Sequence, residues 1–397
     1  MIGVAVMGCG VVGCGVVQML IKNKEEVRRA AGRDVAPLYM LDIRDIAAPE
    51  GVKLTRDVND ILADSAVNVV VETIGGVGAA YDFTKRALES GRHVVTSNKE
   101  LVAARGDELI KLAAGRGVSY LYEASVGGGI PVLHPITRCL RANRLTGVDG
   151  IVNGSTNYLL TQMRDQGVSF PAALGEAKRL GYVEADPAAD VEGWDARRKL
   201  AILANACFGS RFDDDAKIPT AGISGVTEAD MEAAAAFGGA VKLITHARLS
   251  DSGDSWTGWV HPAFVPAAHP LYGVNDVFNA IIAHGNFVGD VMFYGRGAGR
   301  EPTASAVVGD IVEIARGVSP AAVPPAGEAP AFSAADAPIR RLARAASDAR
   351  ESLERLGCPV RPCGDGLAFL APALTRAEFS AACQELNGLS EPLYVLE

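Results

Sequence analysis

Short apolar runs alternate with helical segments through the first third of the chain. Buried strands are predicted at Ile2–Met7, Leu38–Leu41, Val67–Val71, His93–Thr96 and Ser119–Leu121. Helices are predicted between them at about Val11–Ala31, Tyr81–Ser90 and Glu100–Gly115. Runs that are apolar on both faces and alternate with helices are typical of a parallel sheet covered by helices on both sides. The pattern therefore predicts a doubly wound α/β unit over residues 1–126.

The pattern changes after about Gly127. Helices are predicted at Tyr158–Asp165, Phe170–Leu180 and Ala196–Phe208, and strands at Val241–Leu249, Ser255–Val260 and Asn286–Tyr294. This mixture predicts a second, α+β domain over residues 127–300. A further helix is predicted at Thr303–Ala315. We assign the helix region 301–318 to the first unit, which it completes.

Residues 319–331 contain four prolines among alanines and glycines, a composition that predicts a linker. The remaining residues, 332–397, are expected to form a small α+β module. Its predicted elements are a helix at Ile339–Leu356, a strand at Leu367–Leu370, a helix at Arg376–Glu385 and a strand at Leu393–Leu396.

Composition narrows the possible partners and the location. The chain has 47 acidic and 38 basic residues, a net charge of −9 that argues against nucleic-acid and anionic-membrane partners. Residues 1–21 carry no charge, yet five glycines interrupt them and no basic residue precedes them, so neither a signal peptide nor a membrane helix is expected. Seven scattered cysteines without a CxxC pair predict a reduced, cytoplasmic protein, and the scattered histidines favour no transition-metal site.

A glycine motif follows the first predicted strand. Residues 8–13 read Gly-Cys-Gly-Val-Val-Gly, and Val11 and Val12 open the predicted helix. In such a turn Gly8 permits the tight bend, Gly10 lets a pyrophosphate approach the backbone, and Gly13 lets the helix pack on the strand. Helix-start amides favour phosphates. The alternative is an ordinary glycine-rich turn, but the position between strand and helix predicts a Rossmann-type, dinucleotide-binding sheet.

Residues after the later strands would lie at the same edge of that sheet. Asp42 and Arg44 follow the second strand, where an acid would hold the ribose 2′-hydroxyl of NAD and an arginine the 2′-phosphate of NADP. Because both are present, the choice of NAD or NADP stays open, with Arg44 favouring NADP. Thr73 is a further candidate for cofactor contact. Lys99 is either a solvated lysine or a functional one. A cation near a helix start is slightly unfavourable, which is the argument for a function.

An acidic loop precedes a predicted helix in the second domain. Five acids occupy twelve positions, namely Glu184, Asp186, Asp190, Glu192 and Asp195. A solvated loop is the usual explanation of such a run. Here, however, Asp195 and Lys199 lie four residues apart on the apolar face of the helix, so both side chains are predicted to point inward. An inward lysine beside carboxylates is suited to proton transfer.

Each of two further glycine-rich segments has two possible structural interpretations. The segment from Glu123 to Pro131 combines a glutamate with exposed carbonyls, which suits a hard cation, or forms a hinge between the domains. The segment with Gly297 and Gly299 presents backbone amides to a ligand or is a flexible turn.

Taken together, these motifs resemble those of homoserine dehydrogenases over about residues 1–318. The most specific match runs from Gly181 through the acidic loop to Asp195 and Lys199. Supporting matches are the N-terminal glycine motif and the segments 97–99, 123–131, 153–158 and 297–304. Val183 departs from the family, which commonly has a small residue there.

The resemblance implies a reaction and roles for its residues. The reaction interconverts L-homoserine and L-aspartate 4-semialdehyde with NAD or NADP, in the biosynthesis of threonine and methionine. Lys199 would be the general acid/base. Lys99 would lie between the substrate and the cofactor and share in proton transfer. Glu184, Asp190 and Asp195 would bind the substrate. A carboxylate suits the ammonium group of homoserine, and a lysine suits its hydroxyl.

The resemblance also implies cofactor, metal and assembly features. Gly181, Gly297 and Gly299 would approach the nicotinamide half of the cofactor. A sodium ion would be held by the side chain of Glu123 and the carbonyls of Val126, Gly128 and Ile130. The family is usually a homodimer formed through its second domain, so a homodimer is expected here.

The C-terminal residues are similar to the ACT module of the family, a βαββαβ unit that senses an amino acid such as threonine. The family's effector turn combines an acid, a proline and a glycine, whereas this chain has Asp336, Ala337 and Pro338 followed by Ile339. A Cβ at that position would hinder the approach of an effector. We therefore expect a degenerate ACT-like module that contributes to packing, without strong inhibition by threonine.

Two other functions fit part of the sequence. The chain could be another Rossmann-fold dehydrogenase that acts on an amino acid or a semialdehyde. It could also be a dinucleotide sensor without turnover, but such a sensor has no need for Lys99 together with an inward Lys199.

Overall fold

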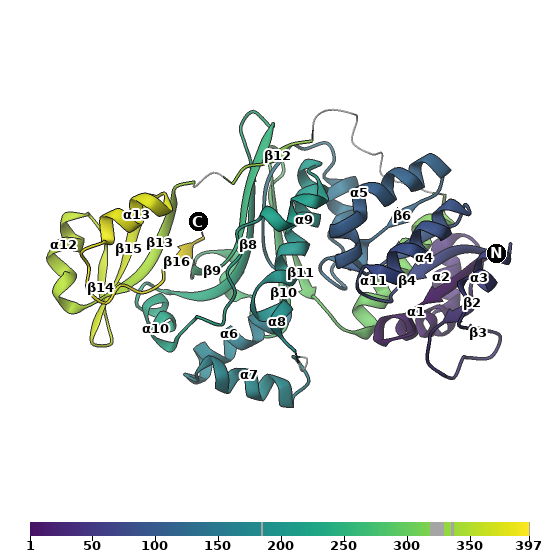
Figure 1. The fold of residues 1–397 in the computed structure, drawn as a ribbon, viewed down its shortest axis with the longest axis horizontal. Coiled ribbons are helices and arrows are strands. Elements are labelled where there is room, and N and C mark those ends of the chain that lie inside the picture. The colour runs from purple at the N-terminus through teal and green to yellow at the C-terminus, as the bar shows by residue number, and fades with distance from the viewer. Residues whose placement is uncertain (184–185, 318–328, 335–336, 397) are drawn as a thin grey trace.

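The computed structural model describes residues 1–183, 186–317, 329–334 and 337–396. Three parts follow one another along the long axis of the molecule (Figure 1). The N-terminal part is built on a parallel sheet, the central part on a mixed sheet, and the C-terminal part is a small module at the opposite end from the N-terminus. The predicted α/β fold class is confirmed.

The first sheet has the strand order β3-β2-β1-β4-β5-β6 among the described residues, and each neighbouring pair is parallel. Its strands are β1 (Ile2–Met7), β2 (Val35–Leu41), β3 (Lys53–Thr55), β4 (Val67–Glu72), β5 (His93–Thr96) and β6 (Tyr120–Leu121). The order reverses at β1, which lies between β2 and β4. Ligands of such sheets bind beyond the carboxyl ends of the strands at this point.

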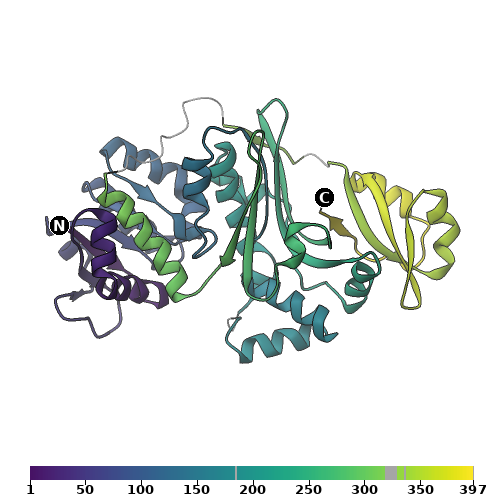
Figure 2. The same cartoon turned by 180° about the vertical axis from the view of Figure 1, so that it is seen from behind.

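Helices cover both faces of the first sheet, as the sequence predicts. They are α1 (Val11–Lys22), α2 (Lys24–Ala31), α3 (Val58–Ala63), α4 (Gly78–Glu89), α5 (Lys99–Arg116) and α11 (Arg300–Ala315). The single helix predicted for residues 11–31 is wrong, because the backbone of Asn23 is not helical and separates α1 from α2. Helix α11 returns from the central part and packs beside α1 (Figure 2), where Val307 and Ile311 share a core with Val16 and Leu20.

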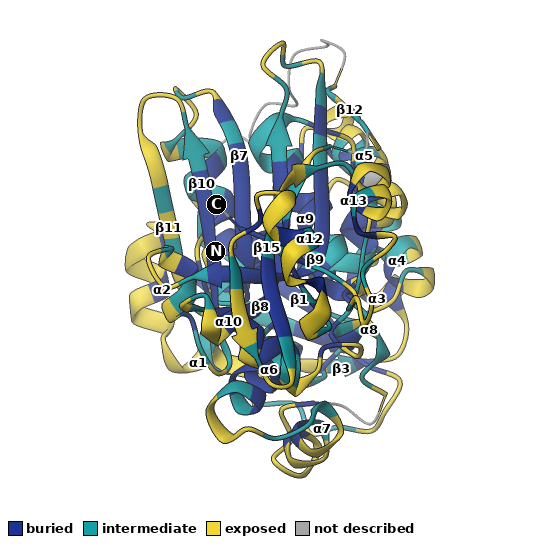
Figure 3. Cartoon of the chain, turned by 90° about the vertical axis from the view of Figure 1, so that its left-hand side faces the viewer, coloured by how far each residue is buried: buried dark blue, intermediate teal, exposed yellow. Residues whose placement is uncertain are grey.

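The second sheet begins with five central strands in the order β11-β10-β7-β8-β9, all antiparallel to their neighbours. They are β7 (Leu145–Ile151), β8 (Gly239–Leu249), β9 (Ser255–Pro266), β10 (Phe278–Gly285) and β11 (Gly289–Arg296). Figure 3 shows β7, β8 and β10 largely buried, whereas the edge strand β11 is mostly exposed. The strand predicted for residues 286–294 corresponds to β11, but its predicted start is wrong, since residues 286–288 form the turn between β10 and β11.

Helices of the central part support the second sheet and carry the acidic loop. They are α6 (Gly154–Gln166), α7 (Phe170–Arg179), α8 (Ala188–Val191), α9 (Trp194–Phe208) and α10 (Glu228–Ala236). Short helical turns are η1 (Glu123–Ser125), η2 (Pro135–Cys139), η3 (Phe212–Lys217) and η4 (Pro270–Gly273). Leu200 and Leu203 of α9 lie in the core that also contains Val148 and Val152, so α9 packs on the sheet through its apolar face.

The C-terminal module has the order β13, α12, β14, β15, α13, β16, which is the βαββαβ order of an ACT module. Its elements are β13 (Ile339–Ala345), η5 (Ser347–Ala349), α12 (Arg350–Arg355), β14 (Val360–Cys363), β15 (Gly366–Leu374), α13 (Arg376–Cys383) and β16 (Leu393–Val395). Strand β16 pairs with β9, with Tyr394 beside Ala263, so the module continues the central sheet. Residue 318, residues 319–328 of the predicted linker and residues 335–336 of the effector turn lie outside the described residues. Strand β12 (Ala331–Phe332) pairs with β9.

The helix predicted for residues 339–356 is wrong over its first half. These residues form β13, which is paired with β15 on one side and β16 on the other. The buried guanidinium of Arg341 donates to the carbonyl oxygens of Ile339 and Leu374. Pairing on both edges thus outweighs the helix propensity of a segment rich in alanine and arginine.

None of the helices in the described ranges is both long enough and apolar enough to cross a membrane.

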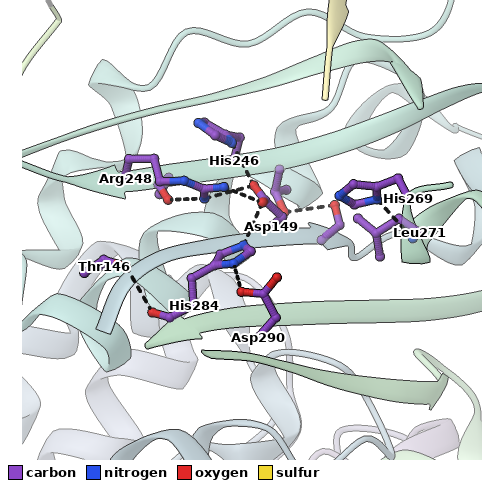
Figure 4. A network of polar contacts seen from close by, with 11 residues as sticks. Thr146, Asp149, His246, Arg248, His269, Leu271, His284 and Asp290 are labelled. Carbon is purple, nitrogen blue, oxygen red and sulfur yellow. Dashed lines mark hydrogen bonds and ion pairs between the residues drawn. The ribbon is translucent and has the colours of Figure 1, made fainter. Parts of the chain in front are cut away.

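A buried polar network holds the central strands together. Asp149 of β7 is fully buried, with His246 Nδ1 at 2.7 Å from Oδ1 and with Arg248 Nη2 at 2.7 Å and His284 Nε2 at 2.8 Å from Oδ2 (Figure 4). Burial alone would raise the pKa of Asp149, but hydrogen bonds from the two histidines and the charge of Arg248 outweigh it and hold this pKa well below its usual range. Since His246 and Arg248 belong to β8 and His284 to β10, one carboxylate ties three strands together.

Replacing Asp149 by Asn should therefore lower the free energy of unfolding by about 1–3 kcal/mol, because the buried carboxylate and its charged hydrogen bonds to Arg248 and the two histidines are lost. Because the pKa is lowered in the folded state, this contribution is complete at pH 7 and is lost only as the pH falls through the acidic range. Urea unfolding at pH 7 measures the difference. The matched control is Asp290→Asn, which removes an exposed acid from the edge of the same network and should cost less than about 1 kcal/mol. Equal stabilities of the two variants would contradict this account.

Candidate active site

The glycine motif forms the turn between β1 and α1. Gly8 has a φ of +87°, and a Cβ there would lie 2.7 Å from the amide nitrogen of Ile74. A Cβ on Gly13 would lie 2.2 Å from the carbonyl oxygen of Gly8, so the helix packs too closely for a side chain. A Cβ on Gly10 would meet nothing within 4 Å, which leaves the backbone open on that side. The structure thus fits the tight bend at Gly8 and the close helix packing at Gly13, and it leaves space beside Gly10.

Helix α1 begins directly at this turn. Its N-cap is Gly10, which makes no side-chain capping bond, and the first helical residues are Val11 and Val12. Their amides are left for an anion, where the helix dipole also favours negative charge. The Thr73 hydroxyl donates to the carbonyl oxygen of Gly8 at 2.6 Å and so fixes the turn from the neighbouring strand. These features fit the pyrophosphate of a nicotinamide dinucleotide.

Asp42 and Arg44 form a pair at the end of β2. The guanidinium of Arg44 donates to both oxygens of Asp42 at 2.8 Å, and also to the carbonyl oxygen of Cys9 at 3.1 Å. The hydrogen bond from Arg44 is the largest influence on Asp42 and lowers its pKa far below the usual range. Asp42 also accepts a hydrogen bond from the Cys9 amide. The two residues are therefore joined to each other and to the glycine turn. They are not two independent candidates for contact with the ribose.

The two candidate catalytic lysines meet at one carboxylate. Lys99 is the first residue of α5, and Asp195 and Lys199 lie one turn apart in α9. Lys199 Nζ donates to Asp195 Oδ2 at 2.8 Å, and Lys99 Nζ lies 3.0 Å from Asp195 Oδ1. Lys199 also donates to the carbonyl oxygen of Val152 at 2.8 Å. Asp195 and Lys199 are buried and Lys99 is partly exposed, so the inward orientation predicted for the first two is the observed one.

Charge pairing decides the ionisation of this cluster. Burial alone would raise the pKa of Asp195, but Lys199 and Lys99 outweigh it and lower this pKa far below the usual range. Attraction by Asp195 is also the largest influence on Lys99, and it raises the pKa of that lysine despite partial burial. Asp195 is thus a fixed negative charge at neutral pH.

Asn153, at the end of β7, joins a second acid to this cluster. Its Nδ2 atom donates to Asp190 Oδ1 at 2.7 Å and to Asp195 Oδ2 at 2.8 Å. Asp190 belongs to the short helix α8, just before α9. The sequence placed Asn153 only within a matching segment and gave it no role. Its position directly before Gly154 at a helix start was the one available signal.

A buried glutamate, which the sequence analysis also missed, fixes the start of α5. Glu72 accepts hydrogen bonds from the Thr96 hydroxyl at 2.6 Å and the Ile74 amide at 2.7 Å. Asn98 lies beside it and caps α5 by accepting from the Leu101 amide at 3.1 Å. Burial is the largest influence on Glu72 and raises its pKa. These bonds connect the ends of β4 and β5, and thereby fix the helix start from which Lys99 extends.

The two glycine-rich segments lie against each other where the chain passes between the N-terminal and central parts. A Cβ on Gly128 would lie 2.4 Å from the carbonyl oxygen of Gly297, and the Gly129 amide donates to the Arg296 carbonyl at 3.2 Å. Gly299 precedes α11 with a φ of +118°. This close crossing fits the hinge reading of residues 123–131.

The carboxylate of Glu123 is already occupied by backbone donors. The amides of Val132 and Leu133 donate to Oε1 at 2.6 and 2.9 Å, and the His134 amide donates to Oε2 at 2.7 Å. Within the described residues, no three His, Cys, Asp or Glu side chains cluster as a metal site. The side chain of Glu123 is thus a poor fit for a cation. The rest of the predicted sodium set consists of the backbone carbonyls of Val126, Gly128 and Ile130.

Within the described residues, Gly181, Gly297 and Gly299 have no hydrogen bond to the lysine cluster. Gly181 is exposed after α7 with a φ of +75°. Glu184 lies outside the described residues.

Comparisons with known proteins agree with this geometry. A family model described as homoserine dehydrogenase matches residues 131–312, and one for its NAD-binding domain matches residues 8–123. The homoserine dehydrogenase of Pseudomonas aeruginosa is 41% identical over 324 residues, which cover 80% of this chain and 73% of that protein. The Mycobacterium tuberculosis protein of the same name is 42% identical over 323 residues, with 79% and 72% covered.

Solved structures extend the likeness to the whole chain. A homoserine dehydrogenase from Thiobacillus denitrificans has a TM-score of 0.90 and 32% identity, covering 100% of this chain and 98% of that one. A hyperthermophilic archaeal homoserine dehydrogenase in complex with NADPH has a TM-score of 0.65 and 26% identity, covering 79% and 97%. The resemblance noted in the sequence is confirmed, and the chain belongs to the homoserine dehydrogenase family of NAD(P)-dependent oxidoreductases.

Proposed function

We propose that the chain interconverts L-homoserine and L-aspartate 4-semialdehyde with NAD or NADP, with Lys199 as the general acid/base. These roles are assigned mainly because Lys99 and Lys199 both form ion pairs with the buried carboxylate of Asp195. This cluster includes a residue at the carboxyl end of β5, where ligands of doubly wound sheets bind. Because the chain belongs to this family, the two alternative functions, another amino-acid dehydrogenase and a dinucleotide sensor, are less well supported.

Lys199 is equipped to move the proton of the substrate hydroxyl. Its ammonium has three donors, of which two are taken by Asp195 and the carbonyl of Val152, so one is left for a substrate oxygen. In the direction of aldehyde reduction, this group donates the proton as the hydroxyl forms, and in the reverse direction the neutral amine accepts it. When bound, the nicotinamide supplies or accepts the hydride. Asp195 holds Lys199 in place for the transfer.

Asp190 is placed to receive the substrate's ammonium group. Asn153 occupies only its Oδ1 atom, and the residue is half-buried. Asp195, by contrast, is buried and already bound by both lysines and Asn153. We therefore assign the substrate ammonium to Asp190, with Glu184 as a further ligand on the resemblance alone. Asp195 becomes the residue that positions the lysines.

Several features stay predictions. The homodimer is supported by exposed apolar side chains at the hairpin between β10 and β11, namely Phe287, Val288, Met292 and Tyr294. A cytoplasmic location, the sodium ion and the boundaries after residues 126 and 300 rest on the sequence. The expectation of weak threonine inhibition involves residues 335–336 and stays a prediction, testable by titrating threonine into the assay.

Replacing Lys199 by Ala should reduce kcat for homoserine oxidation by about 10²–10⁴-fold, because the proton acceptor is lost. Binding of the dinucleotide, measured by fluorescence titration, should be unchanged, since its glycine turn lies in the other part of the chain. A suitable control is Lys111→Ala in the exposed face of α5, which should keep full activity. Activity of the Lys199 variant within a few-fold of the parent would rule out this role.

Replacing Arg44 by Ala should weaken NADP binding by at least about tenfold, because a charged hydrogen bond to the 2′-phosphate is lost. NAD lacks that phosphate, so its dissociation constant should change much less. The dissociation constants of both cofactors are measured for the parent and the variant. If both constants rise equally, Arg44 acts only by holding Asp42 and the glycine turn.

A further inference from the structure

The amide of Asn153 uses all of its hydrogen-bonding capacity at the junction of β7 and α6. Both hydrogens of Nδ2 go to carboxylates, one to Asp190 at 2.7 Å and one to Asp195 at 2.8 Å. Oδ1 accepts from the Thr156 amide at 2.9 Å and so caps α6. Because the oxygen receives a backbone donor, the orientation of the amide is fixed. One half of this side chain therefore serves the helix, and the other half serves the acids.

The acids need such a donor because they are close together. Two carboxylates that bond to one nitrogen repel each other. Lys99 and Lys199 both bind Asp195, whereas Asp190 is tied to this cluster by the amide. A neutral donor between the two acids stabilises both charges without adding a cation that would compete with a substrate ammonium.

We propose that Asn153 is a positioning residue for the reaction, which holds Asp190 in place for the ammonium of the substrate and fixes it relative to Lys199. The inference rests on the proposed function and adds a residue to it. Asn153 orients Asp190 from one side while Val152, its neighbour in the chain, accepts a hydrogen bond from Lys199. The end of β7 thereby sets the spacing between the ammonium-binding acid and the proton-transfer group.

The capping and bridging roles can be separated by substitution. Ser and Asp are both good N-cap residues, so Asn153→Ser and Asn153→Asp retain the cap of α6. Neither can donate to both carboxylates, and Asp adds a third negative charge. The matched control is Asp57→Ser, which exchanges the exposed N-cap of α3 and leaves the site untouched.

The experiment measures the melting temperature, kcat and KM for homoserine, and the pH profile of kcat/KM for the parent and the three variants. We expect near-parental melting temperatures throughout and parental kinetics for Asp57→Ser. Asn153→Ser should lose about 10- to 100-fold in kcat/KM, mostly through KM, because a charged hydrogen bond is lost at the ammonium site. Asn153→Asp should lose at least as much and shift the alkaline-rising limb of the profile to higher pH, because added negative charge stabilises the ammonium form of the lysines.

A purely structural role gives a different result. If both Asn153 variants melt earlier but keep the parental kcat/KM and pH profile, Asn153 only caps α6 and the inference is overturned. A loss in kcat/KM with no change in KM and an unshifted profile for Asn153→Asp would also overturn it. If the parent itself does not oxidise homoserine, the proposed function fails rather than this inference.

Discussion

The buried carboxylate of Asp195 is the interaction on which the rest of the site depends. A charge removed from water is costly unless it is paired and hydrogen-bonded, and here two lysines and one amide compensate it. Removing the carboxylate would leave Lys199 buried without its partner. The pairing also sets geometry, because Lys99 comes from the start of α5 in the N-terminal part and Lys199 from α9 in the central part. The acid thus links the N-terminal part of the chain to the central part.

The fold supports this link from both directions. Glu72 and Asn98 fix the start of α5, while α9 packs on the central sheet and is joined to α5 by an ion pair of Arg198 with Glu100 at 2.9 Å. Strand β7 contains Asp149, which bonds to side chains of the neighbouring strands, and two residues after its end Asn153 lies beside the acids. The same central sheet continues into the C-terminal module through β16, so the module is part of one continuous hydrogen-bonded sheet rather than a separate appendage. Stability and site geometry therefore share the same strands.

Local sequence signals were sufficient where they repeat or obey a strict spacing. The glycine turn at residues 8–13, the parallel sheet and the inward pair Asp195 and Lys199 all follow from such spacing. Local sequence signals failed where contacts between residues far apart in the chain determine the structure. Residues 339–345 have the composition of a helix but are held as β13 by strands on both sides. The bonds of Asn153 to the two acids and of Glu72 to Thr96 likewise join residues far apart in the chain. The pairing of Asp42 with Arg44 is likewise a matter of side-chain direction, which no spacing rule supplies.

The most direct test of the central claim is a double-mutant cycle on kcat/KM with Lys99→Met and Lys199→Met. If both lysines act through the one carboxylate, the double variant should lose little more activity than Lys199→Met alone, since residues that act as a unit are strongly non-additive. The coupling would disappear on changing Asp195 to Asn. If the two losses instead multiply fully in the parent background, the lysines act independently and Asp195 does not unite them.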